Sequence, residues 1–151
     1  MDNKNKIIFD LCGGTGSWSK PYQDAGYVVK LITFPYNDVR NWRKDFEVLN
    51  AIDNVYGILA APPCTMFSFA RTNAKKLRDL HEGMECVRAC LDIIWRVMEI
   101  KQETRKKTLP LKFWTLENPY HGFLPKFLGN PALVFDPWEY GDAYQKKTAL
   151  W

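Results

Sequence analysis

Long apolar runs are missing from this sequence, as are the marks of an exported or anchored chain. No stretch approaches the roughly 20 consecutive apolar residues that a membrane-spanning helix needs. The opening letters, MDNKNK, lead directly into a short apolar run at residues 7–9, so we expect no signal peptide and a cytoplasmic location. Four cysteines without an export signal indicate reduced thiols rather than a disulfide framework.

Charge of one sign is also scarce. The chain has 21 basic and 17 acidic residues, a net charge of +4, which permits a polyanionic partner without requiring one. The modest basic clusters at residues 75–78 and 101–107 are typical of a solvated helix face. We expect no metal site, because His81, Cys86 and Cys90 would lie on one helix without a second set of ligands.

What the sequence does contain is an alternation of strand-like and helix-like segments. Its 151 residues, 46% of them hydrophobic and 25% charged, suit a single globular domain over residues 1–151. Strands are predicted at 7–11, 27–34, 55–61, 113–116 and 148–151, helices at 17–25 and 45–52, and loops around short elements at 118–142. A longer helix is predicted by an apolar stripe made of Leu80, Met84, Val87, Leu91, Ile94, Trp95 and Met98. This alternation predicts an α/β fold with a doubly wound, mostly parallel sheet.

Three motifs fall at predicted strand ends, where ligands bind in such sheets. The first is the glycine turn Asp10-Leu11-Cys12-Gly13-Gly14-Thr15-Gly16-Ser17. Glycines let a backbone approach a ligand, and the N-terminus of the following helix favours a polar or anionic group. The lysine of a phosphate-binding P-loop is missing, and a turn of this kind can also serve tight packing alone.

The other two motifs bring a candidate nucleophile and a candidate acid. Pro62 and Pro63 stiffen the chain before Cys64, so the thiol is held at a strand end instead of sinking into the core. Most free cysteines are structural, but a thiolate at such a place is a competent nucleophile. Glu117 follows the predicted strand 113–116 and is either a solvated charge or an acid beside that nucleophile.

Together these motifs resemble the catalytic domain of the DNA cytosine-5 methyltransferase family. The glycine turn resembles the family's Asp-Leu-Phe-x-Gly-x-Gly loop, Asn37-Asp38-Val39 stands where the family has Gly-Asp-Ile, and Pro63-Cys64 with Phe67-Ser68 matches Pro-Cys-x-x-Phe-Ser. Glu117-Asn118-Pro119 resembles the Glu-Asn-Val motif, and Tyr140-Gly141 with Gln145-Lys146-Lys147 is similar to Tyr-Gly-x-Pro-Gln-x-Arg-x-Arg. The motifs occur in family order over nearly the whole chain.

The resemblance implies a Rossmann-like fold, S-adenosylmethionine as cofactor and DNA as partner. The residues that it implies for cofactor binding are Asp10, Cys12, Gly14, Thr15, Gly16, Ser17, Asp38, Val39 and Pro63. The residues that it implies for catalysis are Cys64, Glu117 and Lys147. In the implied mechanism Cys64 adds to carbon 6 of cytosine while Glu117 contacts N3 and the exocyclic amine, and a duplex base must first leave its stack.

Departures from the family pattern keep other functions open. Cys12 replaces an aromatic residue, Thr33-Phe34-Pro35 offers no acid for the ribose hydroxyls, and lysines replace the last motif's arginines. We expect no separate target-recognition domain, as in compact phage-type forms of the family, and a location in the host cytoplasm if the chain is phage-encoded. A partner chain could supply recognition. The alternatives are a non-catalytic module that binds S-adenosylmethionine or nucleic acid, and a methyltransferase acting on a free pyrimidine nucleotide.

Overall fold

A computed structural model describes residues 2–71, 74–103, 109–143 and 145–151 of the chain. It contains a six-stranded sheet in the order β2-β1-β3-β4-β6-β5, in which the first four strands are parallel and β6 pairs antiparallel with both β4 and β5. The strand bounds are β1 Ile7–Leu11, β2 Val28–Ile32, β3 Val55–Ala60, β4 Phe113–Pro119, β5 Leu133–Phe135 and β6 Thr148–Leu150. The predicted single α/β domain with a mostly parallel sheet is therefore confirmed.

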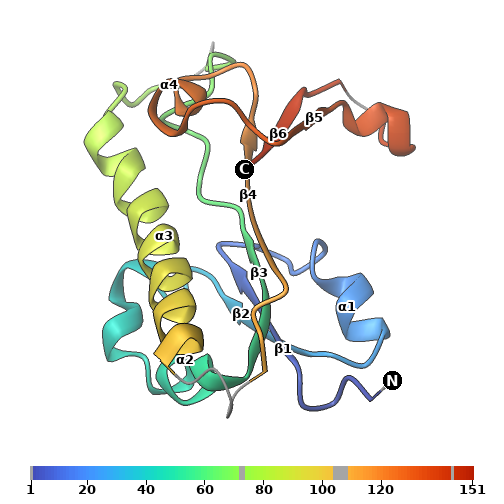
Figure 1. Cartoon of the computed structure of the whole chain (residues 1–151). Helices are drawn as coiled ribbons and strands as arrows, with labels where there is room; N and C mark the ends of the chain where they lie inside the picture. Colours follow the sequence, from blue (N-terminus) through green and yellow to red (C-terminus); the bar gives the residue numbers. More distant parts are fainter. Residues whose placement is uncertain (1, 72–73, 104–108, 144) are drawn as a thin grey trace.

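Helices lie on both sides of the sheet (Figure 1). The short α1 (Lys20–Asp24) lies on one side, where Tyr22 stacks on Phe113 of β4 with ring centroids 5.5 Å apart. The other side carries α2 (Phe46–Ala51), the long α3 (Leu80–Glu103) and the 3-10 helix η1 (Val39–Lys44). The remaining elements are η2 (Ile52–Asn54), α4 (Leu124–Leu128) and η3 (Pro137–Tyr140). No helix in the described part of the chain is long and apolar enough to cross a membrane.

The long helix α3 buries a different stripe from the one that the sequence predicts. Val87 and Ile94 are fully buried as expected, but Trp95 is 51% exposed and Met98 is 40% exposed, so their assignment to the stripe is wrong. The buried face of the helix combines the small residues Gly83, Ala89 and Cys90 with the larger Ile93, Val97 and Ile100. Trp95 and Met98 are apolar and follow a helical spacing, so the apolar pattern alone did not separate them from the buried face.

The first helix and the second strand are shorter than predicted. The helix expected at 17–25 begins only at Lys20, because residues 17–19 belong to the turn and the Ser19 hydroxyl donates to Asp10. The strand expected at 27–34 ends at Ile32, where its pairing with β1 ends at Leu11. Thr33 and Phe34 therefore project beyond the edge of the sheet.

The strand β4 is longer than predicted, and this corrects the position of the third motif. Through Leu116 it pairs with β3 in parallel, and from Glu117 to Pro119 it pairs with β6 in antiparallel register. Glu117 therefore lies within β4 and not after it. The second pairing partner comes from the far end of the chain, so the local sequence did not reveal the extension. The short strand β5 within the expected loop region was also not predicted.

Candidate functional site

The glycine turn is built around a buried carboxylate. Asp10 is fully buried near the end of β1, and its Oδ2 accepts a hydrogen bond of 2.5 Å from Ser19 Oγ. A Cβ at Gly13 would collide with the Asp10 carboxylate, so only glycine fits there. Burial raises the pKa of Asp10, while the Ser19 bond opposes that shift. Asp10 therefore shapes the turn from within.

Within this turn three residues adopt the left-handed backbone conformation that glycine favours. Gly14 and Gly16 have φ angles of 59° and 75°, and Cys12, which is not a glycine, has φ of 61°. The amide of Gly14 donates to the hydroxyl of Thr33 at 3.2 Å, which connects the turn to the chain leaving β2. The Thr15 and Ser17 hydroxyls lie 3.0 Å apart in a mutual hydrogen bond.

A cavity of about 560 Å³ opens beside this turn, within the usual size of small-molecule sites. It lies between the chain leaving β1, β2 and β3 and the first turns of α3. Its lining comprises Cys12, Thr33, Phe34, Asp38, Val39, Arg40, Pro63, Thr65, Met66, Lys76, Glu82, Gly83 and Cys86. Apolar and sulfur-bearing side chains form much of the wall, which suits a flat heterocycle.

Four of the predicted cofactor residues line this cavity, namely Cys12, Asp38, Val39 and Pro63. Among the residues described by the structure, the other predicted cofactor contacts (Asp10, Gly14, Thr15, Gly16 and Ser17) are not part of the lining. The glycine turn thus meets the cavity through Cys12, which carries the only non-glycine positive φ in the described part of the chain.

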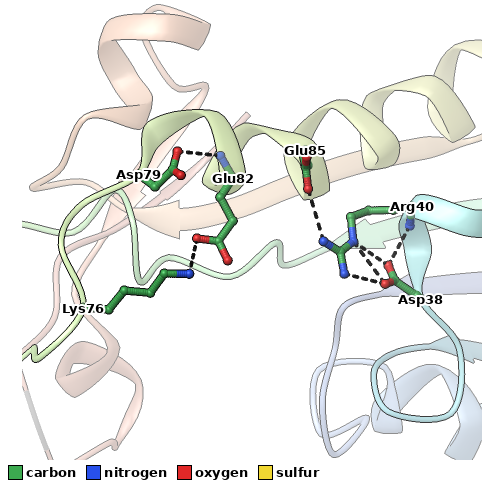
Figure 2. Close-up of polar contacts among 6 residues, drawn as sticks. All are labelled: Asp38, Arg40, Lys76, Asp79, Glu82 and Glu85. Carbon is green, nitrogen blue, oxygen red and sulfur yellow. Dashed lines mark hydrogen bonds and ion pairs between the residues drawn. The ribbon is translucent and has the colours of Figure 1, made fainter.

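Asp38 is not free in this structure (Figure 2). Its Oδ1 accepts from the backbone N–H of Arg40 at 2.9 Å, which caps η1. The Arg40 side chain also donates to both oxygens, through Nε at 2.9 and 3.1 Å and through Nη2 at 2.6 Å. These bonds lower the pKa of Asp38. A ligand amine that approaches this carboxylate has to displace Arg40.

Two ion pairs tie the start of α3 to the cavity. Arg40 Nη1 lies 3.2 Å from Glu85 on α3, and Lys76 Nζ lies 2.6 Å from Glu82 (Figure 2). Asp79 accepts from the Glu82 amide at 3.0 Å, the pattern of a helix N-cap. Both cations of the lining therefore already have carboxylate partners.

Three cysteines meet where the glycine turn faces α3. Cys12 and Cys86 line the cavity, and Cys90 is fully buried one turn further along α3. A hydrogen bond with Cys86 lowers the pKa of Cys12, but a bond with Cys90 and burial outweigh it, so that pKa is raised. The bond with Cys12 and burial likewise raise the pKa of Cys86. The raised pKa values of Cys12 and Cys86 keep these two thiols protonated at neutral pH, which makes them poor nucleophiles.

Cys64 lies in a loop that is fixed by several hydrogen bonds and by a buried side chain. Its carbonyl accepts from the amides of Phe67 and Ser68, both at 2.9 Å, which closes a helix-like turn. Arg78 donates to the carbonyls of Met66 and Ser68 at 2.5 and 3.1 Å. The Cys64 side chain is partly exposed, while Phe67 is fully buried and anchors the loop.

The segments that carry Cys64 and Glu117 are joined by a buried hydrogen bond. Asn118 Nδ2 donates to the carbonyl of Pro62 at 2.9 Å, and Asn118 is fully buried. Cys64 follows Pro62 by two residues and Glu117 directly precedes Asn118, so both candidates lie at the same edge of the sheet. Burial raises the pKa of Glu117, and the charge of Lys146 opposes this shift.

The last predicted catalytic residue, Lys147, is exposed just before β6. Its carbonyl accepts from the Tyr120 amide at 2.8 Å, which attaches this segment to the chain after β4. The structure places the charge of the neighbouring Lys146, rather than that of Lys147, close enough to affect the pKa of Glu117. Sequence register alone did not separate these two lysines.

Several cavity residues escaped the sequence analysis as binding candidates. Phe34 could have been found, because it directly follows a strand that ends at the same edge as the glycine turn. Glu82 and Cys86 carry no such signal, because their place depends on how α3 packs. Within the described ranges, no group of three or more His, Cys, Asp or Glu residues is arranged to hold a metal ion.

Sequence comparison gives no relative on which to base a function. No protein-family model matches the chain, and no curated protein matches its sequence at a significant level.

Proposed function

We propose that this chain is an S-adenosylmethionine-dependent methyltransferase that methylates carbon 5 of cytosine in DNA. The proposal rests on the resemblance of its motifs, and one structural observation carries it. The bond between Asn118 and Pro62 joins the segments of Cys64 and Glu117, which the resemblance pairs in catalysis. The cavity that begins at the adjacent Pro63 gives a cofactor a place beside that edge.

The cavity lining is compatible with S-adenosylmethionine in most respects. Phe34, Val39 and Met66 offer apolar surface for a base, and the volume of about 560 Å³ accommodates a nucleoside. Asp38 can accept a hydrogen bond from an adenine amine only after at least one of the hydrogen bonds that Arg40 donates to it is broken. S-adenosylmethionine, when bound, would supply an electrophilic methyl group through cleavage of its sulfur–methyl bond, and would leave as S-adenosylhomocysteine.

The residues of the chain then have distinct tasks. The Cys64 sulfur donates an electron pair to carbon 6 of cytosine, which makes carbon 5 nucleophilic. Glu117 shares a proton with N3 of the ring, and its raised pKa favours the protonated form that this task needs. Once carbon 5 carries the methyl group, loss of its proton and elimination of the sulfur release Cys64 and the product.

A methyl-transfer assay with tritiated S-adenosylmethionine tests this proposal. We expect label to enter duplex DNA with the wild-type chain, and none with Cys64→Ser, a nearly isosteric change. Glu99→Gln is the control and should retain transfer, because Glu99 is exposed and is not part of the cavity lining. Label in free cytidine nucleotides but not in DNA would favour the small-substrate alternative. No transfer to either substrate, with cofactor binding intact, would favour the binding module.

A further inference from the structure

The cations of the cavity are all engaged, and this bears on which ligands the cavity accepts. Arg40 is held by Asp38 on its own element and by Glu85 on α3. Lys76 is held by Glu82 on the first turn of α3. Figure 2 shows the Lys76 cluster at the start of α3 and the Arg40 cluster further along the helix, at Glu85. Two positive charges therefore face three carboxylates at this rim.

The positive end of α3 is neutralised in the same way. A helix N-terminus attracts anions through its free amides. Here Asp79 already accepts from the amide of Glu82, and the Glu82 carboxylate adds a negative charge in the first turn. The N-terminus of α3 therefore attracts an incoming anion less strongly than an uncapped helix N-terminus would.

From this arrangement we infer that the cavity selects nucleosides without a phosphate group and discriminates electrostatically against nucleotides. The inference rests on the proposed function, since it names the ligand class of the same cavity. A phosphate would have to take Arg40 or Lys76 from its carboxylate, and that carboxylate would remain beside the new anion. Because the phosphate and the carboxylate would compete for one cation, their repulsion would lower the affinity for a phosphate-bearing ligand. The three carboxylates are the specificity-determining groups.

Adenosine and 5′-AMP make a matched pair of probes, because they differ by one phosphate. Isothermal titration of the wild-type chain should give a dissociation constant at least about tenfold higher for AMP than for adenosine, each 1.4 kcal/mol being tenfold. The discrimination should shrink between about 0.05 M and about 0.5 M NaCl, because salt screens exposed charges. A purely steric exclusion of phosphate would not respond to salt.

Substitution of a carboxylate supplies the second arm of the test. Glu82→Gln should free Lys76 and lower the ratio of the AMP to the adenosine dissociation constant at least about fivefold. Glu85→Gln removes one of the two carboxylate partners of Arg40 and should also lower this ratio. It replaces Glu82→Gln in the test if Glu82→Gln does not fold. The matched control is Glu99→Gln on the same helix. Glu99 pairs with Arg96, and neither residue lines the cavity, so the ratio of the two dissociation constants should equal the wild-type ratio.

The outcomes separate this inference from the proposed function. Equal affinity for AMP and adenosine in the wild-type chain, or a ratio that responds neither to salt nor to Glu82→Gln, overturns the inference alone. Failure to bind adenosine and S-adenosylhomocysteine overturns the proposed function and this inference with it.

Discussion

Asn118→Ala is the perturbation for which the structure gives the clearest magnitude. The substitution removes the only described bond of the Asn118 amide, 2.9 Å to the Pro62 carbonyl, and leaves a buried acceptor without its partner. Such an orphaned group costs about 1–3 kcal/mol, and we expect about 2 kcal/mol here. In a chain of this length about 2 kcal/mol corresponds to a decrease in Tm of about 4–8 °C.

Urea unfolding followed by far-UV circular dichroism measures this loss directly. Asn130→Ala, an exposed position before β5, is the control and should change the free energy of unfolding by less than about 0.5 kcal/mol. Asn118→Asp should cost more at pH 8 than at pH 5, because its buried carboxylate would have to ionise. If Asn118→Ala is as stable as the control, the bond does not join the edge that carries Cys64 and Glu117.

Substitutions at three further positions test the cavity and the glycine turn. Gly13→Ala should lower the free energy of unfolding by about 1–3 kcal/mol, measured by urea titration, because its methyl group meets the Asp10 carboxylate. The pKa of Asp10 is raised above its ordinary value of 3.8, so its contribution to the free energy of unfolding is fully present below pH 3.8 and is lost as pH rises through the pKa of the folded state. Asn does not titrate, so Asp10→Asn should become more stable relative to wild type as pH rises above 3.8. Asp38→Ala should weaken binding of S-adenosylhomocysteine by about 1–3 kcal/mol in titration calorimetry, the scale of a charge-assisted hydrogen bond. Asp38→Asn should retain the cap of η1, and equal affinities of wild type and Asp38→Ala would remove Asp38 from the cofactor site.

The sequence predicted the parts of the fold that depend on local pattern. The strands β1 and β3 are nearly continuous apolar runs between clear breakers, so their places were predicted within a residue. The parallel sheet follows from the alternation of such strands with helices. Because the carboxyl ends of parallel strands share one edge, the sequence also indicated that Cys12 and Pro63 belong to the same region.

The parts that escaped prediction depend on contacts between distant segments. The change of partner along β4 needs β6, which lies near the far end of the chain. The engagement of Arg40 by both Asp38 and Glu85 needs η1 and α3 side by side. A motif predicts which residue types recur, but it does not show whether a carboxylate is already occupied by a neighbouring cation.

Covalent trapping on Cys64 is the most direct test of the central claim. The chain is incubated with S-adenosylmethionine and duplex oligonucleotides that carry 5-fluorocytosine in many sequence contexts, and intact mass and peptide mapping follow. Fluorine cannot leave carbon 5 as a cation, so elimination stops and the methylated oligonucleotide should stay bound to the Cys64 sulfur. Cys86→Ser should still form the adduct, whereas Cys64→Ser should form none. Absence of an adduct with any DNA or nucleotide, together with equal reactivity of Cys64 and Cys86 toward thiol reagents, would contradict the account.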